Sequence, residues 1–175
     1  MAVDVVTPIL QIVGYQNSGK TTVGEKLITK LTNDGVRVGT IKHHGHGGVP
    51  ERFDTDKDSY RHRKAGAVVS AVEGAGELQV HILKGLKLEE MVNLYGQFDL
   101  DFILIEGYKK APYRKVVMIR EEKDQELLLK VNNIFAVISW IPLSKEVENQ
   151  YKVFSIERED DYLTLFTSLV RECHG

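Results

Sequence analysis

Four residues near the N-terminus have the types and spacing that bind the phosphates of a nucleotide. Gly14, Gly19, Lys20 and Thr21 fit the pattern G-x-x-x-x-G-K-[ST]. The glycines let the backbone curl so that successive N–H groups face a phosphate, the lysine meets the β- and γ-phosphates, and the threonine hydroxyl ligates Mg²⁺. The predicted nucleotide-binding residues are Gly14, Tyr15, Gln16, Asn17, Ser18, Gly19, Lys20, Thr21 and Thr22.

A carboxylate is also needed, because Mg²⁺ at such a loop is positioned by an acidic residue at the end of a neighbouring strand. Glu106 directly follows the most continuous apolar run of the chain, 102–105. We therefore predict Glu106 as the catalytic carboxylate and, with Thr21, as a metal residue. Asp101 precedes the same run and is expected at the opposite end of the sheet.

A polar segment over 43–58 is the other region dense in chemistry, and it leaves the carboxyl end of a predicted strand, where ligands of open α/β sheets bind. Its imidazoles suit a transition metal, and its carboxylates suit Mg²⁺ directly or through water. A switch loop that contacts the nucleotide or a partner is the alternative, and the sequence leaves both open. The residues concerned are His43, His44 and His46, the predicted metal residues Asp54 and Asp56, and Asp58.

The elements that must position these groups alternate between strand and helix. A strand, the glycine-rich turn and a helix occur in the order that the phosphate motif requires. The whole pattern predicts an α/β fold of the P-loop NTPase type, with a doubly wound, mostly parallel sheet, helices on both faces and a β-hairpin extension, in a single domain over 1–175. Predicted strands are 9–13, 36–41, 67–72, 77–83, 102–105, 116–119, 134–138 and 153–156; predicted helices are 21–31, 59–66, 86–94, 125–131 and 160–171.

Composition limits the partners. The 175 residues carry 23 basic and 25 acidic side chains, so a net charge of −2 gives no field that would capture nucleic acid or an anionic membrane. No apolar run is long enough for a membrane helix. Cys173 is the only cysteine, which fits a reducing compartment. We expect a cytoplasmic protein that binds neither nucleic acid nor membrane.

Several runs together resemble the MobB family, over most of the chain and in order. They are the Gly-Lys-Thr-Thr loop, the run 40–44, the aspartates 54–58, the stretch 63–67 and the run 105–109. The resemblance implies a homodimeric P-loop protein that binds GTP and Mg²⁺, hydrolyses GTP weakly, and assists a MobA-like guanylyltransferase that joins GMP to the molybdopterin cofactor. It carries Gly14 to Thr22 over as the nucleotide loop and Glu106 as the acidic strand end.

Guanine specificity comes from the resemblance alone, because the chain has no Asn-Lys-x-Asp signature. Trp140 stands where the base-reading carboxylate of such a signature would lie. Two other functions remain open. A nickel metallochaperone GTPase would use the histidines, and a small-molecule P-loop kinase would use 43–64 as its lid. Neither a glutamine at a water-positioning site nor an obvious arginine finger is found, so slow hydrolysis is expected.

The segment 77–83 alternates apolar and polar residues outside the strand–helix repeat. Such a strand is an exposed edge, and exposed edges with an apolar face are usually paired, covered or blunted by charge. We therefore expect a homodimer that forms through this segment.

Overall fold

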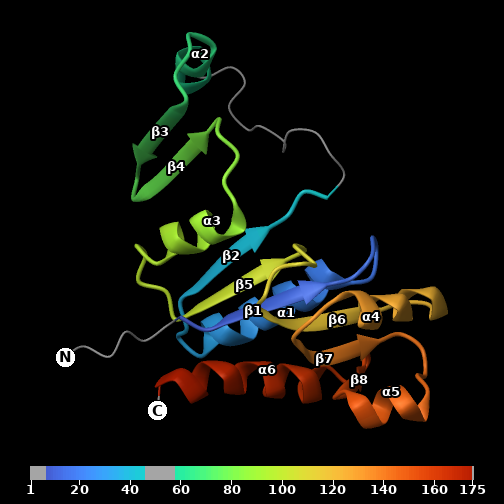
Figure 1. Ribbon diagram of the computed structural model, residues 1–175. Helices are drawn as coiled ribbons and strands as arrows, with labels where there is room; N and C mark the ends of the chain where they lie inside the picture. Colours follow the sequence, from blue (N-terminus) through green and yellow to red (C-terminus); the bar gives the residue numbers. More distant parts are fainter. Residues whose placement is uncertain (1–6, 46–57, 175) are drawn as a thin grey trace. The chain divides into compact units, whose positions relative to one another are not determined.

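Six parallel strands form the sheet that carries the phosphate loop. The computed structural model describes residues 7–45 and 58–174 (Figure 1). The order across the sheet is β2-β5-β1-β6-β7-β8. The strands are β1 (Ile9–Val13), β2 (Val38–Lys42), β5 (Phe102–Glu106), β6 (Arg114–Ile119), β7 (Ile134–Ser139) and β8 (Val153–Ser155).

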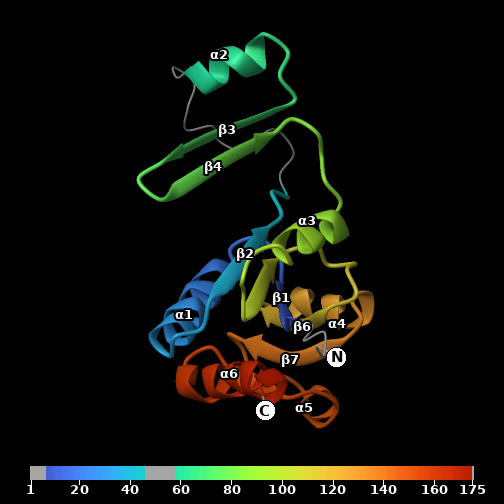
Figure 2. The same cartoon turned by 90° about the vertical axis from the view of Figure 1, so that its left-hand side faces the viewer.

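Helices cover both faces of this sheet, as the sequence predicts. α1 (Lys20–Asn33) and α6 (Glu159–His174) pack on the face that holds Leu10 and Ile12. The opposite face holds Val13 and Val117 and packs on α4 (Leu127–Lys130) and on residues of α5 (Lys145–Gln150), with the 3₁₀ helix η1 (Glu122–Glu126) just before α4. Figure 2 shows α1 and α4 on opposite sides of the strands. The doubly wound fold class is therefore confirmed.

β1 is the strand that a phosphate loop must follow, and it lies between β5 and β6. The register places Ile12 beside Glu106 and Leu10 beside Arg114. The carboxyl end of β5 is therefore next to the loop that leaves β1. This adjacency brings Glu106 to the phosphate loop.

The chain passes from β5 to β6 without a helix, over residues 107–113. Two buried polar side chains bind the carbonyl groups of this connection. The Gln11 amide donates to the carbonyls of Gly107 and Tyr108, each at 2.5 Å, and the Lys115 ammonium donates to the carbonyls of Ala111 and, at 3.0 Å, Tyr113. Both side chains are fully buried, so these bonds fix the segment that directly follows Glu106.

A second compact unit spans His44–Glu90, and the first comprises Met1–His43 with Met91–Gly175. In the second unit β3 (Val69–Gly74) and β4 (Glu77–Ile82) form an antiparallel hairpin, and α2 (Asp58–Lys64) packs against β3. α3 (Leu88–Tyr95) begins at the end of this unit. The prediction of a single domain over 1–175 stays a prediction.

The predicted elements all occur, but two expectations were wrong. The strand over 67–72 was expected to be buried, whereas β3 is exposed along most of its length because, among the strands of 7–45 and 58–174, it pairs with β4 alone. Helix α5 was not predicted, since its charged sequence has no apolar stripe; Ser144 caps it by accepting from the N–H of Val147. Over 7–45 and 58–174, no helix has the length and apolarity that crossing a bilayer requires.

Candidate nucleotide-binding site

The loop between β1 and α1 has a tight backbone geometry that depends on its glycines. A Cβ at Gly14 would lie 2.4 Å from Ser18 Oγ and 2.9 Å from Met118 Cβ, so the first glycine is required for close packing. Gly19 has a φ of 91° and Asn17 a φ of 57°, in the left-handed region where glycine and asparagine are tolerated. The sequence thus curls the loop tightly in front of α1.

The amino end of α1 has no side chain that competes for its N–H groups. Gly19 caps the helix without a side-chain bond, and no acidic residue lies in the first turn. The helix dipole therefore places a partial positive charge at the loop. Together with the glycine geometry, this is an arrangement suited to phosphate.

Lys20 lies folded across the loop. Its ammonium donates to the Tyr15 carbonyl at 2.6 Å and to Ser18 Oγ at 3.4 Å. Burial lowers its pKa from the usual value, and the Glu106 carboxylate opposes that shift. A partly buried ammonium with only neutral oxygens bound gains most from an anionic oxygen, which a phosphate supplies.

Thr21, Glu106 and Lys42 meet on the β5 side of the loop. The Thr21 hydroxyl lies 3.2 Å and 3.1 Å from the two Glu106 carboxylate oxygens. The Lys42 ammonium lies 3.2 Å from both Thr21 Oγ and Glu106 Oε1. The register pairs Lys42 directly with Glu106 across β2 and β5. Two of the four predicted metal residues, Thr21 and Glu106, therefore come together, and both contact the Lys42 ammonium.

Tyr15 and Lys109 form the wall of the loop toward the 107–113 connection. The Lys109 ammonium lies over the Tyr15 ring, 3.9 Å from its centre, and the Tyr15 hydroxyl donates to the Glu126 carboxylate. Burial lowers the pKa of Lys109. Lys109 is thus the third lysine beside the loop, after Lys20 and Lys42.

Two side chains from the ends of β6 and β7 bind the loop on its other side. Arg120 donates to the Asn17 carbonyl at 2.6 Å, and the Trp140 indole N–H donates to the Ser18 carbonyl at 3.0 Å. The sequence analysis did not identify either residue as a contact of the loop. Sequence spacing could not reveal these contacts, because they depend on β6 and β7 lying beside β1 in the sheet.

His43, from the 43–46 cluster, lies beside Glu106 and Tyr108. Its backbone N–H donates to the Glu106 carbonyl at 2.9 Å, and the centre of its ring lies 4.6 Å from the centre of the Tyr108 ring. Within 7–45 and 58–174, no three histidine, cysteine or acidic side chains come close enough together to hold a metal ion. His46, Asp54 and Asp56 lie outside the described residues, so their predicted roles stay predictions.

Asp101 lies at the opposite end of β5, as expected. Its carboxylate accepts from the N–H and the guanidinium of Arg37, at 2.8–2.9 Å. This ion pair lies at the amino ends of β2 and β5, at the opposite end of these strands from Glu106.

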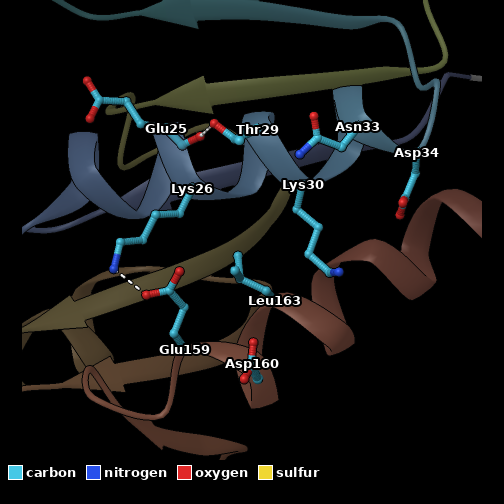
Figure 3. Close-up of a pocket in the computed structure, with 9 residues that line it drawn as sticks. All are labelled: Glu25, Lys26, Thr29, Lys30, Asn33, Asp34, Glu159, Asp160 and Leu163. Atoms are coloured by element: carbon cyan, nitrogen blue, oxygen red, sulfur yellow. Dashed lines mark hydrogen bonds and ion pairs between the residues drawn. The ribbon is translucent and has the colours of Figure 1, made fainter.

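A groove also runs between α1 and α6, away from the phosphate loop (Figure 3). It lies along the later turns of α1, where the Lys26–Glu159 ion pair crosses it. Acidic side chains such as Glu25 and Asp160 line it together with lysines. This mixed charge, and the absence of a glycine-rich turn there, make the groove a poor phosphate site.

Comparison with known proteins agrees with the geometry. Residues 9–140 match the family described as "Molybdopterin guanine dinucleotide synthesis protein B", MobB. A "Probable molybdopterin-guanine dinucleotide biosynthesis adapter protein" of Bacillus subtilis is 44% identical over 154 residues, 88% of this chain and 87% of the relative. The adapter protein of Escherichia coli is 34% identical over 84% of this chain and 86% of its own length.

Solved structures of similar proteins have the same fold. The crystal structure of Bacillus subtilis MobB superposes with a TM-score of 0.82 at 40% identity, over 93% of this chain and 97% of that one. A MobB homologue of Bacillus stearothermophilus gives 0.77 at 38% identity, over 94% and 98%.

Proposed function

The chain belongs to the MobB family, and from this premise we propose that it is a GTP-binding adapter in molybdopterin-guanine dinucleotide biosynthesis, with weak Mg²⁺-dependent GTP hydrolysis. Family membership favours this function over a nickel metallochaperone or a small-molecule kinase. The proposal of nucleotide binding rests on one observation. Thr21 contacts Glu106 beside a glycine-rich loop and Lys20.

The donor set at this position fits Mg²⁺. A hydroxyl and a carboxylate are hard oxygen ligands, and a loop carrying phosphates supplies the rest of the shell along with water. The same two groups hold the Lys42 ammonium at 3.2 Å, which indicates that they attract a cation there. Bound Mg²⁺ would neutralise charge that develops on the transferring phosphate.

The residues of the site would then have separate roles in binding and hydrolysis. Lys20 would exchange its bonds to Tyr15 and Ser18 for phosphate oxygens, and the loop N–H groups would cradle the remaining charge. Glu106 would orient the ion or a water molecule. Hydrolysis is expected to be far slower than the ~1–100 s⁻¹ of kinases, because Arg120 is bound to a loop carbonyl on the side away from Glu106.

The adapter role implies pathway enzymes as partners, and the proposed ones are a MobA-like guanylyltransferase and the molybdopterin cofactor. The proposed compartment is the cytoplasm. The proposed oligomer is a homodimer through the β3–β4 hairpin. Cross-strand pairing puts Val69 beside Ile82 and Ala71 beside Val80 on one face, and the three larger side chains are 38–51% exposed. A two-stranded hairpin needs apolar surface covered to be stable in water, so a second copy that covers this face would stabilise it.

A nucleotide screen tests the proposal. The protein is titrated calorimetrically with GTP, GDP, ATP and CTP in Mg²⁺, alone and with the guanylyltransferase and molybdopterin. The proposal predicts tightest binding for GTP and a change in affinity when both partners are added. Equal, millimolar binding of all four nucleotides, unaffected by the partners, would contradict it.

A further inference from the structure

Trp140 is held at the phosphate loop from three directions. Its backbone N–H donates to the Ile119 carbonyl at 2.9 Å, which ties it to β6, and its indole N–H donates to the Ser18 carbonyl. The ring also approaches Gly19, where a Cβ would lie 3.3 Å from Trp140 Cζ2. The position of the indole is thus set by the loop that it touches.

The same side chain remains 52% exposed. Its only polar atom is already bonded, so what it presents to solvent is apolar ring surface. An exposed tryptophan fixed in this way has the properties of a contact surface for a flat apolar ligand. It differs from Phe98, which is equally exposed at 53% but lies in the turn after α3, and whose ring meets Tyr95.

The two sides of the loop differ in chemistry. On the β5 side, Glu106 and Thr21 form the cation-binding pair, and on the β6 and β7 side stand Arg120 and Trp140. β1 separates the two sides in the sheet. A nucleotide that crosses the loop with its terminal phosphate toward Glu106 would place its nucleoside on the side of Trp140.

We propose that Trp140 is the platform on which the base of the bound nucleotide stacks. This inference rests on the proposed nucleotide-binding function and adds the residue that contacts the base. Every base offers a π-face, so stacking on an indole supplies affinity without choosing between bases. Trp140 therefore contributes similarly to the binding of GTP and of ATP, and guanine selection must come from other contacts.

The chain contains one tryptophan, so its intrinsic fluorescence reports on this position alone. GTP is titrated against the parent protein, and inorganic tripolyphosphate serves as the probe that lacks a base. GTP should change the emission, and tripolyphosphate should bind with little change. In calorimetry, Trp140→Ala should weaken GTP and ATP by about 5- to 150-fold and leave tripolyphosphate affinity unchanged.

Two variants separate stacking from support of the loop. Trp140→Phe keeps an aromatic face but loses the bond to Ser18, and it should retain GTP affinity within a few-fold. Phe98→Ala removes an equally exposed ring elsewhere and should bind as the parent does. Unchanged GTP affinity in Trp140→Ala, or an equal loss for GTP and tripolyphosphate, would overturn the inference while the proposed function stands. A parent protein that binds neither probe would overturn the proposed function itself.

Discussion

The Thr21 hydroxyl lies within 3.2 Å of both carboxylate oxygens of Glu106, although 85 residues separate them in the chain. The contact exists because β5 pairs with β1 in a register that sets Glu106 beside Ile12. One residue therefore comes from the helix that follows the phosphate loop, and the other from the neighbouring strand. Their contact lies on the side of the site where we propose that Mg²⁺ binds.

Glu106→Gln tests the role of this carboxylate. Glutamine keeps an oxygen for the Thr21 hydroxyl but loses the charge, so Mg²⁺-dependent hydrolysis of GTP should fall by about 10²-fold or more, while GTP affinity mostly survives through Lys20 and the loop. Phosphate release and calorimetry measure the two effects separately. Glu157→Gln, an exposed glutamate after β8, is the matched control. Equal hydrolysis by Glu106→Gln and the parent would assign Glu106 a structural role.

Lys115→Met tests the buried support of the 107–113 connection. The variant leaves the Ala111 and Tyr113 carbonyls without their donor, which should reduce the free energy of unfolding by about 1–3 kcal/mol. Urea denaturation followed by circular dichroism measures the loss. Lys110→Met changes an exposed lysine of the same connection and should have little effect.

The Lys115 variant also has a signature in pH. Burial lowers the pKa of Lys115 in the folded chain below 10.5, so the unfolded chain binds more protons in the window between the two values. The contribution of Lys115 to the free energy of unfolding therefore rises with pH through that window. The unfolding free energy of the parent should increase relative to that of Lys115→Met as the pH approaches 10.5. Parallel plots of unfolding free energy against pH for the two proteins would show that burial does not lower the pKa of Lys115.

Val80→Lys tests the proposed dimer face. A charge in the middle of the apolar face that Val80 shares with Ala71 should convert a dimer to a monomer, because an ammonium would be buried unpaired at the two-fold contact. Light scattering should report the change, with GTP affinity retained. Leu129→Lys adds the same charge at a 91% exposed leucine of α4 and should leave the dimer intact. A dimeric Val80→Lys protein would place the interface elsewhere, and a monomeric parent would end the proposal.

The sequence predicts the chemistry of the β5 side of the site because two local patterns carry it. The glycine-rich loop and an apolar strand that ends in Glu106 imply adjacent strands, and the structure places them so. Lys42 was missed because its role depends on a register across β2 and β5 that spacing does not reveal. Arg120 and Trp140 were missed as loop contacts for the same reason.

The hairpin shows a different limit. In the sequence, an apolar run such as 67–72 has the same pattern whether its strand is buried in the core or exposed on the surface of the chain. The structure shows that this strand is not buried within the chain, since Val69 and Val72 are each 51% exposed and β4 is its one neighbour among the described strands. The presence of the strand follows from local sequence, whereas its burial depends on what covers it.

Calorimetric titration of GTP with Mg²⁺ into the parent protein and Lys20→Ala tests the account most directly. Lys20 contacts only loop oxygens, so the variant should keep its circular dichroism spectrum and thermal midpoint. Its GTP affinity should fall by about 10- to 150-fold, the cost of a lost hydrogen bond between charged groups. A folded Lys20→Ala protein that binds GTP as tightly as the parent would contradict the assignment of this loop as the nucleotide site.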